Sequence, residues 1–185
     1  MQVPKGREQV CAALIETATT LFAQRGPAAV SVREIAQLTG VNHGLIHRHF
    51  GSKNGLLVAV LDQLADTIGA TVGETTENEP LFPLLRAVLG ATSQQGAWLR
   101  ILAWSILDDA DLGDMKNRFP MVDRMIAAAQ REDIGPLDAQ ARVTFILSVS
   151  LGMALFGSSL KQATEQDEPQ WIRTKSQIRS IVFKT

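Results

Sequence analysis

The stretch SVREIAQLTGVNHGLIHRHF, residues 31–50, decides the fold. Its first part carries Ser31 and Glu34 three positions apart, which is the spacing of a capping box. In such a box the serine oxygen accepts a hydrogen bond from the amide three residues on, and the glutamate reaches back to the serine amide. The pattern therefore predicts a short helix over residues 32–38.

The second part of the stretch predicts a turn and another helix. Gly40 can take the left-handed backbone conformation that ends many helices. Asn42 is a favourable residue type for opening the next helix, which we expect over 42–49, with Ile46 and Phe50 facing inward. Two short helices joined by a tight glycine-containing turn indicate a helix-turn-helix, whose second helix lies in the major groove of DNA.

Helical periodicity extends along the rest of the chain, and no stretch alternates convincingly as a strand would. One face of the first helix gathers apolar residues, which we expect to be buried: Val10, Leu14, Ala18, Leu21 and Phe22. Helices are expected over 7–24, 32–38, 42–49, 53–74, 82–94, 96–109, 120–132, 137–163 and 168–183. The polar stretch 76–80 is interpreted as a linker.

Composition points to an ordinary globular protein. Of 185 residues, 45% are hydrophobic and 20% charged, so the chain is able to bury a core. The single cysteine, Cys11, cannot form an internal disulfide, and the first residues lack the long apolar run of a secretory signal. We therefore expect a cytoplasmic protein.

Charge is unevenly distributed along the chain. Residues 1–60 hold six Lys and Arg against three Glu, a net charge of +3, whereas the remainder carries −4 before histidines are counted. A mildly basic head on an acidic body suits a polyanionic partner at one end, although a difference of this size also arises by chance.

The apolar run VTFILSVSLGMALFGSSL, residues 143–160, reaches the lower end of the length that a bilayer requires. Its serine and threonine residues dilute the hydrophobicity, and no aromatic anchor flanks it, so we expect a helix packed in protein and no membrane span. Ser148 and Gly152 belong to small residues recurring every four positions, which allow a second helix to approach closely. This helix is the first candidate for a subunit interface.

The segment from Arg7 through LFAQRGPAAVSVREIAQLTGVNHGLIHRHFGSKNGLLVAVL resembles the amino-terminal domain of the TetR (tetracycline-repressor) family of bacterial transcriptional regulators. The motifs LF, RG, SVREIA, GV, HF, SK and LL follow in the family's order. The resemblance implies an all-α fold in which residues 1–52 form a three-helix DNA-binding domain with the helix-turn-helix. Residues 53–185 would then form a helical ligand-binding and dimerisation domain.

The same resemblance implies which residues contact DNA. The candidates are Ser31, Arg33, Asn42, His43, Gly44, His47, Arg48, His49 and Lys53. Among them Ser31, Arg33 and Lys53 would contact phosphate at helix starts, where backbone amides favour anions. Asn42, His43 and Gly44 would approach base edges.

Two positions depart from the family pattern. The family commonly has tyrosine where this chain has His47, and the shorter imidazole reaches less far towards a phosphate. It often has serine or threonine at Asn42, so a different operator sequence is one consequence.

An effector pocket is indicated only by its apolar character. The run GAWLRILAWSIL, residues 96–107, and the aromatic residues that follow are able to line a mostly apolar cavity between helices. The candidate ligand contacts are Trp98, Trp104, Phe119 and Phe145. Core packing explains each of these residues equally well, and that alternative stays open.

Metal binding and catalysis receive little support from the residues. His43 and His47 stand four apart, a spacing that can chelate zinc, but no nearby carboxylate or thiol completes four ligands. The acidic run over 108–114 lacks an accompanying histidine, nucleophile or glycine-rich phosphate loop. We expect neither an enzyme nor a cofactor; the alternative function is a metal-responsive DNA-binding sensor that uses the two histidines.

The resulting hypothesis is a ligand-responsive transcriptional regulator. We expect a homodimer that binds a palindromic duplex DNA operator as a repressor and is released by a small, mostly apolar effector. The operator, the effector and the regulated genes are not encoded in any recognisable pattern.

Overall fold

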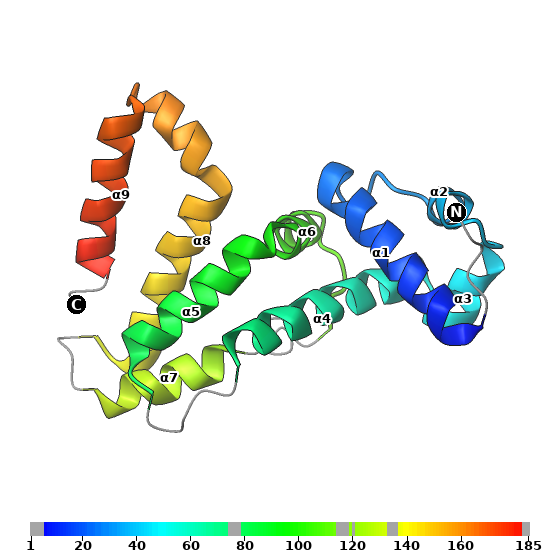
Figure 1. The fold of residues 1–185 in the computed structure, drawn as a ribbon, viewed down its shortest axis with the longest axis horizontal. Helices are drawn as coiled ribbons and strands as arrows, with labels where there is room; N and C mark the ends of the chain where they lie inside the picture. Colours follow the sequence, from blue (N-terminus) through cyan, green and yellow to red (C-terminus); the bar gives the residue numbers. More distant parts are fainter. Residues whose placement is uncertain (1–5, 74–78, 114–118, 120, 133–136, 183–185) are drawn as a thin grey trace. The chain divides into compact units, whose positions relative to one another are not determined.

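A computed structural model describes residues 6–73, 79–113, 119, 121–132 and 137–182. In these residues every regular element is a helix (Figure 1). The helices are α1 (Arg7–Arg25), α2 (Val32–Thr39), α3 (Gly44–Phe50), α4 (Lys53–Val72), α5 (Leu81–Gln94), α6 (Gly96–Leu107), α7 (Val122–Arg131), α8 (Ala139–Ala163) and α9 (Glu168–Val182). The all-helical prediction is confirmed, with most ends within two residues of those expected. Residues 76–78 of the predicted linker, Pro120 and residue 114 of the acidic run lie outside the described residues.

The chain divides into two compact units. The first comprises Met1–Ala70 and Gln95–Pro120, and the second comprises Thr71–Gln94 and Met121–Thr185. Helix α6 therefore belongs with the amino-terminal helices by its contacts. The predicted division into a DNA-binding part, residues 1–52, and a ligand-binding and dimerisation part, residues 53–185, concerns function and stays a prediction.

Helix α1 buries one continuous face. All five residues expected on that face are buried: Val10, Leu14, Ala18, Leu21 and Phe22. The helix ends where Gly26 takes a positive φ of 79°, a conformation that side chains with a Cβ rarely adopt. This face packs against α2 and α6 within the first unit.

Helix α2 begins and ends as the sequence predicts. The Ser31 side chain accepts a hydrogen bond from the Glu34 amide at 3.2 Å, which caps the helix. At the other end Gly40 is left-handed, and the amides of Gly40 and Val41 bond to the carbonyls of Gln37 and Ala36. These two bonds form a Schellman motif, which fixes the direction of the chain as it enters α3.

A glycine near the start of α4 allows α3 and α4 to meet closely. A Cβ on Gly55 would lie 1.9 Å from the Phe50 carbonyl oxygen, a distance that no side chain tolerates. The Gly55 amide also donates to the Ser52 hydroxyl at 3.0 Å, so Ser52 caps the start of α4. The close approach sets the angle between the two helices.

The second unit has its own apolar core, contributed by α5, α7 and α8. The buried residues are Leu81, Leu84, Leu85, Val88, Met125, Ala128, Ala129, Val143 and Ile146. Helix α9 returns alongside α8 after a tight turn (Figure 1), and Trp171 packs 3.5 Å from the Cβ position of Gly157. Lys161 and Glu168 form an ion pair across that turn.

Helix α8 is long but mostly uncovered within the chain. Only four of its 25 residues are buried. Large apolar side chains on it are exposed: Phe145, Leu155, Phe156 and Leu160. The sequence predicts a helix packed on all sides, and a single chain does not supply that packing.

By length and composition, α4 and α8 are each able to cross a membrane. The most apolar window of α4 is 39% buried and that of α8 is 17% buried. Core helices of soluble proteins pass the same test, so it carries little weight.

Candidate nucleic-acid interface

The outer face of α3 is polar and open. His43, Gly44, His47 and Arg48 are exposed, and Ile46 on the opposite face is completely buried. A recognition helix must expose polar groups on one side while its apolar side packs against the domain. The structure therefore brings four of the nine DNA-contact candidates together as exposed residues of α3 and its N-cap.

Asn42 lies just before α3, which begins at Gly44 and not at Asn42 as expected. The reason is that the Asn42 side chain turns back, and its Oδ1 accepts a hydrogen bond from the Gly44 amide at 2.8 Å. Asn42 therefore caps the turn with its oxygen, and its side-chain NH₂ group stays available as a donor. An amide donor of this kind suits an acceptor on a base edge.

The two histidines at the end of α3 have neighbours of their own. His47 Nδ1 lies 3.3 Å from the Gly51 carbonyl oxygen, a hydrogen bond when Nδ1 carries the proton. His49 is half-buried, and its ring meets Phe50 edge-on at 6.5 Å between centroids. The Nδ1 side of the His47 ring thus lies against its own helix end.

Two exposed guanidinium groups are available to bind phosphate. Arg33 in the first turn of α2 and Arg48 in α3 are both exposed. Within the described residues neither makes a hydrogen bond or an ion pair to the protein. A free guanidinium offers five N–H donors in a planar fork that matches phosphate oxygens.

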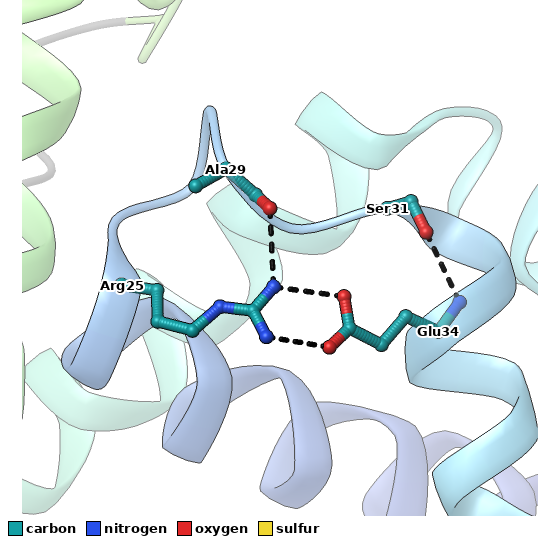
Figure 2. A network of polar contacts seen from close by, with 4 residues as sticks. All are labelled: Arg25, Ala29, Ser31 and Glu34. Atoms are coloured by element: carbon teal, nitrogen blue, oxygen red, sulfur yellow. Dashed lines mark hydrogen bonds and ion pairs between the residues drawn. The ribbon is translucent and has the colours of Figure 1, made fainter.

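A polar network fixes the start of α2 (Figure 2). Arg25 Nη1 and Nη2 donate to Glu34 Oε1 and Oε2 at 2.6 and 2.9 Å, and Nη2 also donates to the Ala29 carbonyl at 3.1 Å. The Arg25 hydrogen bond chiefly lowers the pKa of Glu34, and a backbone hydrogen bond from Ser31 acts in the same direction. The partnership also raises the pKa of Arg25. The glutamate of the predicted capping box is therefore shared with an arginine nine residues earlier.

Lys53, a predicted phosphate contact, has partners inside the protein. Its Nζ donates to the Pro27 carbonyl at 3.0 Å and to the Val30 carbonyl at 3.1 Å. The side chain is half-buried as a result. These contacts join the start of α4 to the loop that precedes α2, and no sequence pattern indicates them.

Comparison with known proteins identifies the fold. Residues 14–60 match the family described as bacterial regulatory proteins, tetR family. The chain is also 38% identical over 167 residues to the HTH-type transcriptional repressor Rv3405c of Mycobacterium tuberculosis, covering 90% of this chain and 84% of that protein. The chain belongs to the TetR family. It is a DNA-binding helix-turn-helix transcriptional regulator.

Solved TetR-family structures share the fold. A putative TetR-family regulator from Rhodococcus sp. matches with a TM-score of 0.66 at 19% identity, over 95% of this chain and 99% of that chain. The regulator PfmR from Thermus thermophilus matches with a TM-score of 0.64 at 18% identity, over 82% of this chain and 86% of that chain. The matches extend well beyond the helix-turn-helix, so the carboxy-terminal helices also follow the TetR-family fold.

Two of the four ligand-contact candidates of this TetR-family chain meet. Trp98 on α6 and Phe119 pack edge to face, with ring centroids 5.6 Å apart and an interplanar angle of 87°. Trp98 is 4% exposed, and its indole Nε1 finds no hydrogen-bond acceptor in the described residues. A buried donor without an acceptor is unusual, because leaving it unpaired costs roughly 1–3 kcal/mol.

The other two candidates have different surroundings. Trp104 packs over the end of α1, with ring atoms 3.1 Å from the position that a Cβ of Gly26 would take. Phe145 lies on α8 in the second unit and is 40% exposed. Ligand contact stays a prediction for all four residues.

Metal sensing by the TetR-family chain gains no support. Among the described residues, no group of three or more His, Cys, Asp or Glu side chains is arranged to hold a metal ion. The described members of the acidic run, Asp108, Asp109 and Asp111, are exposed. The relatives that the chain resembles are transcriptional regulators, which is not an enzymatic role.

Proposed function

We propose that this TetR-family chain acts as a homodimeric, ligand-responsive repressor that binds a palindromic operator in the cytoplasm. The observation that carries the proposal is the pair of unengaged guanidinium groups, Arg33 and Arg48, beside the exposed face of α3. Repression, as opposed to activation, is supported by a relative that is 38% identical and named a repressor.

DNA contacts divide into anchoring and reading groups. Arg33, Arg48 and the capped start of α2 at Ser31 anchor the domain on phosphates, because guanidinium groups and helix amides both suit anions. His43, Gly44 and the Asn42 amide group read base edges from the first turn of α3. In a two-fold dimer the two copies of α3 reach successive major grooves when they stand about 34–36 Å apart, or a multiple of that distance.

The dimer forms through α8 and α9. Exposed apolar side chains on these helices favour burial against a second copy: Phe145, Leu155, Phe156, Leu160, Ile172 and Ile181. The small residues Ser148 and Gly152 let a partner helix come close, and no other atom lies within 4 Å of a Cβ built on Gly152. A symmetric pair of such surfaces closes as an isologous interface.

A small, mostly apolar molecule carrying a hydrogen-bond acceptor releases the operator. The edge-to-face pair of Trp98 and Phe119 offers aromatic surface, and the unpaired Trp98 indole N–H offers a donor. Binding there lowers DNA occupancy when the bound conformation favours a different spacing of the two α3 helices.

Selection of bound sequences from random duplex DNA tests the proposal. We expect an enriched two-fold site, weaker binding of every sequence by Arg33→Ala, and altered base preference in His43→Ala. Arg100→Ala in α6, which is also exposed, serves as the control for loss of a guanidinium group outside α2 and α3. The proposal fails if the protein shows no preference for duplex DNA over a polymer of equal charge.

A further inference from the structure

We propose that Lys53 is a positioning residue, which fixes the loop over residues 26–30 and so presents the first turn of α2 to DNA. The step from loop to DNA rests on the proposed function. The fixing of the loop is independent of it and is testable without any DNA.

The geometry of Lys53 carries the inference. Lys53 is the first residue of α4, and its ammonium group donates to two loop carbonyls, those of Pro27 and Val30, at 3.0 and 3.1 Å. Two of its three N–H donors are therefore used inside the protein. These bonds span 26 and 23 residues of sequence, so they hold the loop against a separate helix.

The two carbonyls belong to a turn that leads directly into α2. The Pro27 carbonyl also accepts from the Val30 amide at 3.3 Å, which closes the turn. Val30 is only 1% exposed, and the next residue, Ser31, caps α2. Lys53 thus bonds to Val30, the residue immediately before the Ser31 cap. Arg33 lies in α2, two residues after that cap.

Two other side chains hold the same loop from other elements. Arg25 at the end of α1 donates to the Ala29 carbonyl, and Trp104 of α6 packs over Gly26. In this arrangement the hydrogen bonds of Lys53 connect the loop to α4. A loop held before binding does not have to be ordered during binding, which removes an entropic cost from the complex.

Hydrogen exchange in the absence of DNA tests the first half of the proposal. In Lys53→Met, which keeps the apolar stem and removes the donors, we expect the amides of Val30 and Glu34 to exchange roughly ten- to a hundredfold faster. Lys53→Arg restores donors and should restore protection. Amides in the interior of α4, such as that of Val60, report whether the variant remains folded.

A double-mutant cycle on DNA tests the second half. With mixed-sequence duplex DNA at fixed salt, we expect Lys53→Met to weaken binding by roughly tenfold in the parent protein. In the Arg33→Ala background the loss should shrink to about twofold or less, because Lys53 acts through the turn that carries Arg33. A direct phosphate contact by Lys53 gives equal losses in both backgrounds.

Unchanged exchange at Val30 and Glu34 in Lys53→Met overturns the proposal, whatever happens with DNA. Equal losses in the two backgrounds overturn the link to α2 and assign Lys53 to the duplex directly. If the parent protein does not bind duplex DNA, the proposed function fails, and the exchange experiment still decides the role of Lys53 in the loop.

Discussion

Helices α1 and α8 are both long and both carry apolar side chains, yet those side chains are buried to different extents. In α1 the five apolar residues of one face are all buried within the chain. In α8 only Val143, Ile146, Gly157 and the arginine at 142 are buried, and Phe156 is 58% exposed. The apolar face of α1 is covered by its own domain, whereas most of α8 is left uncovered, which is why we propose that a second copy packs against it.

Removing a phenylalanine ring from each helix should separate the two cases most strongly. Phe22→Ala leaves a cavity at a fully buried site in α1, and we expect a loss of about 3–5 kcal/mol in the free energy of unfolding. Phe156→Ala should cost the isolated chain only about 0.5 kcal/mol or less. Urea unfolding at several protein concentrations measures both. Equal losses at every concentration would remove the distinction between the helices.

A charge on α8 should act on the dimer and not on the fold. Phe156→Asp places a carboxylate on the proposed interface, and we expect the dimer dissociation constant to rise by roughly a hundredfold. The control is Leu107→Asp at the end of α6, where the side chain is 78% exposed. Sedimentation equilibrium measures the dissociation constants. Similar shifts in both variants would mean that α8 is not the subunit interface.

Two helical glycines allow a comparison of a crowded backbone position with an open one. Gly55→Ala pushes a Cβ into the Phe50 carbonyl, and we expect a destabilisation of about 1–3 kcal/mol as α3 and α4 move apart. Gly90→Ala in α5 meets no atom within 4 Å and should stabilise the helix by roughly 0.5–1 kcal/mol. Thermal unfolding of both variants provides the measurement; destabilisation by both substitutions would contradict the steric argument.

Local patterns predicted most of the first unit. The buried face of α1 follows from apolar residues at helical spacing, and the Ser31 cap and the Gly40 turn follow from contacts within four residues. The contacts between elements were not predictable in this way. Lys53 reaches carbonyls 23 and 26 residues away, and the need for glycine at 55 depends on the angle at which α3 meets α4.

The second unit shows a different limit. An apolar run such as 143–160 predicts burial, but periodicity cannot distinguish a core from a surface that a second copy covers.

The ligand candidates could not be assigned from the sequence either, because core residues and ligand contacts are both apolar. Trp98 and Phe119 pair, while Trp104 packs over Gly26, and only the fold separates these roles.

The smallest expected effect concerns the ion pairs of the two units. The pKa of Glu34 is lowered chiefly by its hydrogen bond to Arg25, and that of Glu168 chiefly by its hydrogen bond to Lys161. A carboxylate whose pKa is lower in the folded state stabilises the fold above its unfolded-state pKa, and that contribution disappears as the pH falls through the lowered value. Glu34→Gln and Glu168→Gln should therefore lower the urea midpoint slightly near neutrality and leave it unchanged in acid.

Between these two variants Glu34→Gln should have the larger effect near neutrality. Glu34 accepts two hydrogen bonds from an arginine that also donates to the Ala29 carbonyl, whereas Lys161 and Glu168 form a single contact. Bidentate geometry strengthens an exposed ion pair that is otherwise worth little. A midpoint shift in Glu34→Gln that persists in strong acid would mean that the substitution acts through packing or the helix cap and not through the ion pair.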